Sequence, residues 1–99
     1  MIANFSDVKN QITEYTEFNL LVPEREINKW FGNEFDNAPE CYRERFGPFL
    51  VGIYGKELSI MGSAEDFQKA SWWKEIEKDI IVDNIAEDVD VWEIYIKEN

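Results

Sequence analysis

Six carboxylates stand between residues 79 and 93, and no basic residue interrupts them. They are Asp79, Asp83, Glu87, Asp88, Asp90 and Glu93. Like charges gathered this closely repel one another and lower stability. Such a cluster can form an electrostatic surface for a cationic partner, and the alternative use of a charged run is solubility alone. We take Asp83, Glu87, Asp88, Asp90 and Glu93 as candidate partner-binding residues.

The same carboxylates do not match a metal site or a catalytic motif. Asp88, Asp90 and Glu93 superficially follow the spacing of a calcium loop, but the glycine turn and the twelve-residue spacing are missing. The chain has no histidine, which excludes histidine zinc sites and histidine-based nucleophile activation. It also has no glycine-rich phosphate loop and no serine nucleophile elbow. We therefore expect no enzymatic activity, no metal and no cofactor.

Two aromatic residues are candidate anchors for a protein partner. Trp73 lies on the apolar stripe of a predicted helix, and its neighbour Trp72 is rotated from it by about 100°. Tyr54 lies on the more polar face of a predicted hairpin. Exposed tryptophan and tyrosine beside acidic groups are typical of binding hot spots. The alternative for Trp72 is a place at the margin of the core.

Acidity extends over the whole chain of 99 residues, which carries 21 acids and 10 bases and a net charge of −11. A nucleic-acid partner is therefore not expected, because phosphate binding needs a basic surface. The sequence has no apolar run near the roughly 20 residues that span a bilayer, so no membrane association is expected. The single cysteine, Cys41, permits no internal disulfide and suits a reducing compartment. We expect one acidic α+β domain over residues 1–99, located in the cytoplasm.

Apolar spacing and capping residues predict helices over 7–15, 23–31 and 64–79, with a short helix over 40–45 inside an ordered loop. Ser6 is the expected N-cap of the first helix. The helix over 64–79 has the most regular apolar stripe, and Ser63 is its expected N-cap with Asp66 as capping partner. The β-branched residues 80–85 fit either the end of this helix or a strand.

A hairpin over 49–61 is the clearest strand signal, because Gly55-Lys56 suits a type II′ turn. In this register Val51 lies opposite Ile60 and Ile53 opposite Leu58, all on one face. A short strand or an extended link is expected over 18–22. A further strand is expected over 89–96, and its apolar residues on both faces suit the sheet interior or a covered edge. The fold class follows as α+β: a small antiparallel sheet of three to four strands, including the 49–61 hairpin, with two to three helices packed on one face.

In its size, charge, lack of catalytic groups and surplus aromatics, the chain resembles, as a class, the small acidic inhibitors of bacteria and phages. This class includes immunity proteins that neutralise nuclease toxins and proteins that mimic nucleic acid. The resemblance implies a cytoplasmic antitoxin-like protein that blocks a cationic protein partner, such as the active site of a toxin or nuclease. The alternative is a regulatory or structural protein-interaction module, with homodimers through the sheet edge or the Trp72 surface, whose acidity serves only solubility.

Overall fold

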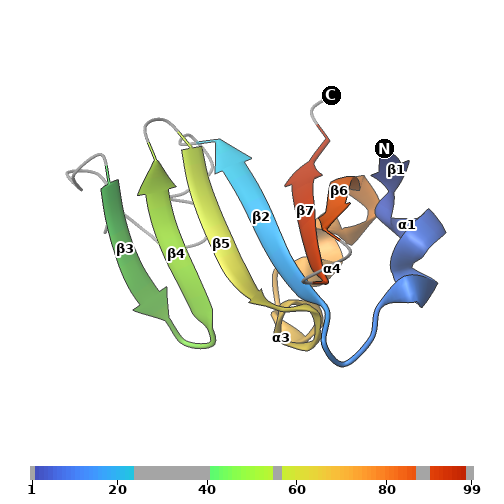
Figure 1. Cartoon of the computed structure of the whole chain (residues 1–99), viewed down its shortest axis with the longest axis horizontal. Coiled ribbons are helices and arrows are strands. Elements are labelled where there is room, and N and C mark those ends of the chain that lie inside the picture. The colour runs from blue at the N-terminus through green and yellow to red at the C-terminus, as the bar shows by residue number, and fades with distance from the viewer. Residues whose placement is uncertain (1, 24–40, 55–56, 87–89, 98–99) are drawn as a thin grey trace.

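The computed structural model describes residues 2–23, 41–54, 57–86 and 90–97. Within them the chain forms one sheet and several short helices (Figure 1). The strands are β1 (Ala3–Asn4), β2 (Glu17–Pro23), β3 (Cys41–Phe46), β4 (Phe49–Tyr54), β5 (Glu57–Ser63), β6 (Ile80–Ala86) and β7 (Val91–Ile96). The helices are α1 (Phe5–Val8), α3 (Ala64–Lys69) and α4 (Trp73–Ile76), with the 3₁₀ segments η1 (Lys9–Gln11) and η2 (Glu77–Asp79). The Cα radius of gyration, 13.1 Å, is that of a compact chain of about 100 residues.

β2 is the middle strand of the sheet, whose order is β1-β6-β7-β2-β5-β4-β3. Neighbouring strands are antiparallel except β2 and β7, which are parallel. The parallel pair places a strand from the N-terminal part of the chain beside the C-terminal strand (Figure 1). β2 therefore joins the β3–β4–β5 half of the sheet to the β6–β7 half.

This architecture shows that the expected fold class is wrong. In place of a three- to four-stranded antiparallel sheet with helices packed on one face, the protein is a seven-stranded mixed sheet with only short helices. The segment expected to hold a short helix at 40–45 is strand β3, which pairs with the hairpin along Cys41–Phe46. The ambiguous segment after Asp79 is strand β6. Pairing with a preformed neighbour overrides weak local preferences in both places.

The predicted helix over 64–79 is interrupted. α3 ends at Lys69, its C-cap Ala70 has an extended backbone (φ −67°, ψ 138°), and α4 starts at Trp73. On an unbroken helix Trp72 and Trp73 would point about 100° apart. With the break, Trp72 packs against Phe49 with ring centroids 5.7 Å apart, and Trp73 stacks on Phe18 at 5.7 Å. Both indole rings thus pack against core aromatic rings where the helix is interrupted.

The other helix predictions have mixed outcomes. The Ser63 cap is confirmed, since its Oγ accepts a hydrogen bond from the Asp66 N–H at 3.1 Å. The predicted helix over 7–15 is shorter and earlier, because α1 begins at Phe5, before Ser6, and η1 ends at Gln11. The predicted helix over 23–31 lies outside the described residues, apart from Pro23 at the end of β2.

The hairpin register is confirmed, with Val51 opposite Ile60 and Ile53 opposite Leu58. Its turn at Gly55-Lys56 lies outside the described residues. The segment 18–22 is a strand and forms the centre of β2. The last strand lies in the sheet interior between β6 and β2, so of the two positions expected for it the interior one is correct.

The buried apolar side chains of the five central strands all lie on one face of the sheet. They are Phe18, Leu20 and Val22 of β2, Phe49, Val51 and Ile53 of β4, Leu58 and Ile60 of β5, Ile80 and Val82 of β6, and Trp92 and Ile94 of β7. Phe5 of α1, Phe67 of α3 and Trp73 of α4 complete this core. Phe18 contacts all three of these rings and also Trp92 on the neighbouring strand. The core is thus an aromatic cluster centred on β2.

Gly62 provides the space for this cluster. It lies opposite Phe18 in the β2–β5 register, and a Cβ added there would come within 2.8 Å of the Phe49 ring. Phe49 is itself held against Phe67 with ring centroids 4.9 Å apart, so it cannot move away without disturbing the cluster.

We expect Gly62→Ala to lower the free energy of unfolding by about 1–3 kcal/mol, because the added methyl overpacks the core. Urea denaturation followed by tryptophan fluorescence measures this loss. Gly52→Ala is the matched control, since Gly52 lines a surface hollow and an alanine in a strand is favoured over glycine. Equal stability of Gly62→Ala and Gly52→Ala would contradict the role given to Gly62.

Candidate functional site

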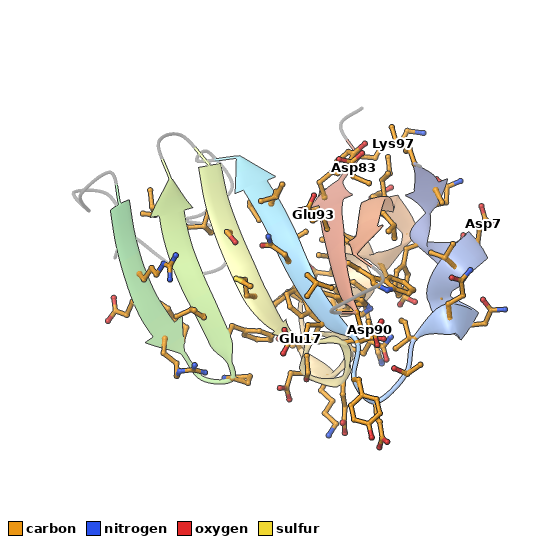
Figure 2. The ribbon with its side chains drawn as sticks, in the orientation of Figure 1. Asp7, Glu17, Asp83, Asp90, Glu93 and Lys97 are labelled. Carbon is orange, nitrogen blue, oxygen red and sulfur yellow. The ribbon has the colours of Figure 1, made fainter. Side chains whose placement is uncertain are left out.

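Acidic side chains gather where β2 and β7 run side by side. We define the acidic surface as Glu14, Glu17, Asp83, Asp90 and Glu93. Figure 2 shows Glu17 and Asp90 near one end of the β2–β7 pair, and Asp83 and Glu93 nearer the other end. The parallel register places Glu17 beside Val91 and Asn19 beside Glu93, so carboxylates distant in sequence share one surface. Glu14, Glu17 and Asp83 are exposed, and Asp90 and Glu93 are half-buried.

Asp90 has a structural role in addition to its charge. Its carboxylate accepts hydrogen bonds from the hydroxyls of Thr13 at 3.0 Å and Thr16 at 3.4 Å. Its carbonyl oxygen accepts from the Glu17 N–H at 3.0 Å. The backbone of Asp90 has a φ of 52°, which asparagine and aspartate tolerate better than most residues. Asp90 therefore fastens the loop before β2 to the start of β7.

This loop carries an exposed aromatic ring that the sequence analysis did not identify. Tyr15 lies between Thr13 and Thr16, and its side chain is 75% exposed. Helical spacing suggested a core position for Tyr15, but its segment is a turn closed by the Thr13 N–H donating to Thr16 Oγ1 at 2.9 Å. The two threonines flanking Glu14-Tyr15 were the available signal, because threonine hydroxyls favour such turns.

The other residues that the sequence suggested for partner binding are not found beside Tyr15. Trp72 is half-buried on the helical side of the sheet, with its ring against Phe49 and Phe67. Tyr54 ends β4, and its side chain is not among those described. Glu87 and Asp88 lie outside the described residues. Of the predicted set, Asp83 and Glu93 lie nearer one end of the β2–β7 pair and Asp90 near the other, while Trp72 lies on the opposite face from Glu93.

The chemistry of this surface is that of its carboxylates. No three metal-ligating side chains come together within residues 2–23, 41–54, 57–86 and 90–97. In the part of the chain that the structure describes, no helix has the length and apolar character needed to cross a membrane. Carboxylates at a partly exposed surface can accept hydrogen bonds from lysine and arginine side chains.

Comparison of the chain with models of protein families, with curated proteins and with solved structures found no match.

The interactions of Asp90 predict a difference between its two simplest variants. Asp90→Ala should lower the free energy of unfolding by about 2 kcal/mol, because it removes charge-assisted hydrogen bonds to two threonines. Asp90→Asn keeps an acceptor oxygen and tolerates the positive φ, so its loss should be below about 1 kcal/mol. Urea denaturation of the two variants measures the difference, and equal losses would contradict the role given to the acceptor oxygen that asparagine keeps.

Proposed function

We propose that this protein is a small acidic inhibitor that binds and blocks a cationic protein, such as the phosphate-binding active site of a toxin or nuclease, in the cytoplasm. It acts by binding and not as an enzyme. The supporting observation is Tyr15, an exposed ring that follows Glu14 in the turn that Asp90 fastens through Thr13 and Thr16. An aromatic anchor surrounded by charges complementary to the partner has the composition of a binding hot spot.

The carboxylates and the ring contribute in different ways. Glu14 and Glu17 are exposed, so they remain available to lysine and arginine side chains that would otherwise hold a phosphate group. The carboxylate of Asp90 already accepts hydrogen bonds from Thr13 and Thr16, so its main contribution is to hold the turn that carries Tyr15 in place. The ring then occupies a pocket of the partner, and the bulk of the sheet covers the active site.

Net charge should accelerate the encounter. A chain with a net charge of −11 attracts a basic partner from a distance. Exposed charges are screened beyond about 8 Å at physiological ionic strength, so the attraction weakens as salt is added. Tyr15 and the other apolar contacts depend less on salt and set how long the complex lasts.

The direct test is capture of the partner with three forms of the protein. Wild type, Glu14→Gln/Glu17→Gln and the control Asp7→Asn/Glu75→Gln are immobilised, and lysate of the native host is washed over each at rising salt. The control removes the same charge from exposed positions on α1 and α4. We expect one basic protein to bind wild type and control equally and to bind Glu14→Gln/Glu17→Gln about tenfold more weakly.

The captured protein must also lose its own activity when wild type is added in equimolar amount. Equal retention of the partner by the site variant and the control would contradict the proposed surface, and an unimpaired partner would contradict the inhibitor function.

A further inference from the structure

The face of the sheet opposite the core is open, in that no helix among the described residues lies over it (Figure 1). Two rows of residues cross this face at right angles to the strands. The first row is Arg45, Leu50, Met61, Asn19 and Glu93, on β3, β4, β5, β2 and β7 in that order. The second row is Arg43, Gly52, Ser59, Leu21 and Tyr95 on the same strands.

The open face is basic at one side and acidic at the other. Arg43 and Arg45 are exposed on the edge strand β3, and half-buried Glu93 lies four strands away on β7. With neighbouring strands about 4.8 Å apart, the two sides are separated by about 19 Å. β5 lies midway between them, and its Met61 is one of the few large apolar side chains exposed in the described residues, at 38%.

A hollow of about 260 Å³ lies on the basic half of this face. Its lining residues are Arg43, Leu50, Gly52, Ser59 and Met61. Gly52 contributes no side chain, so the hollow lies above the backbone of β4. In the second row, Gly52 and Leu21 are the neighbours of Ser59 on its two sides. Leu21, on the acidic half, is half-buried. One half of the face thus has a depression where the other half has an apolar side chain.

We propose that this face binds a second copy of the chain across a two-fold axis that runs along β5. This rotation places the β3 side of one copy over the β7 side of the other. In the first row Met61 lies at the axis and Arg45 faces Glu93 of the second copy. In the second row Ser59 lies at the axis and Leu21 of the second copy faces the hollow above Gly52. The Arg45–Glu93 and Leu21–hollow contacts each occur twice, while Met61 and Ser59 each face their own counterpart once, as a two-fold interface requires.

Sheets packed face to face lie about 10 Å apart, a gap that arginine and glutamate side chains bridge together. Five strands and about five residues along each give a footprint of roughly 20 Å by 16 Å per copy. A footprint of about 320 Å² per copy is smaller than the roughly 800 Å² per partner of a standard interface, so we expect a weak, rapidly reversible dimer. The dimer differs from one formed through the sheet edge or Trp72, since it uses neither.

Exchange of charges tests the geometry, because Arg45 is exposed and Glu93 is half-buried on the open face, so neither side chain belongs to the buried core. Arg45→Glu places two like-charged pairs in the dimer, and Glu93→Arg does the same with the opposite sign. Sedimentation velocity over a range of concentrations should show wild-type dimers and a dissociation constant raised about tenfold or more in each single variant. The combined Arg45→Glu/Glu93→Arg variant, and an equimolar mixture of the two single variants, should return to within about threefold of wild type. Lys74→Glu, exposed on α4, is the matched control and should change nothing.

A zero-length cross-link identifies the contact. In an Arg45→Lys variant, carbodiimide should couple the introduced lysine to Glu93 of the other copy, since about 19 Å separates the two positions within one chain. Mass spectrometry of a mixture of isotopically light and heavy chains distinguishes the linkage between copies from one within a copy. A wild type that stays monomeric overturns the proposal. A dimer whose dissociation constant is the same in the charge-exchange variants also overturns it. Neither outcome affects the inhibitor function, which is tested at Glu14 and Glu17.

Discussion

Packing around Phe18 is the constraint on which the rest of the structure depends. This residue is fully buried near the start of the central strand β2, and its ring contacts Phe5, Phe67, Trp73 and Trp92. These partners come from α1, α3, α4 and β7, so one side chain brings the neighbouring strand and all three short helices into one core. The helices are too short to be stable alone, and tertiary contacts of this kind are what hold them. The absence of a side chain at Gly62 leaves the space for the cluster.

Local signals predicted the elements whose partners are close in sequence. The hairpin register and the Ser63 cap follow from residues within a few positions of one another, and both are confirmed. The parallel pairing of β2 with β7 joins segments more than 70 residues apart, and neither strand has a residue pattern that identifies its partner. The interruption at Ala70 also escaped prediction, because apolar spacing continues through it. It is explained by the packing of Trp72 and Trp73, which only the assembled core shows.

Contacts between segments distant in sequence also limited the prediction of the candidate site. Charge density alone pointed to the segment around Asp90 and Glu93, and the structure does place these residues at one surface with Asp83. Glu14, Tyr15 and Glu17 were missed because their link to Asp90 runs through threonine hydroxyls across the β2–β7 pair. Trp72 was chosen for its position on a helix that the chain does not form. Glu93 belongs both to the acidic surface and to the proposed dimer face, so a partner that covers Glu93 would compete with the second copy.

The central claim is that charge governs how fast a cationic partner is found, while Tyr15 governs how long it stays. Stopped-flow association and dissociation rates for the captured partner, with wild type and Tyr15→Ala over a range of salt concentrations, test both parts together. The account predicts a wild-type association rate that falls steeply with salt, and a Tyr15→Ala variant with the same association rate but faster dissociation. An association rate that does not change with salt, or a dissociation rate unchanged by Tyr15→Ala, would contradict it.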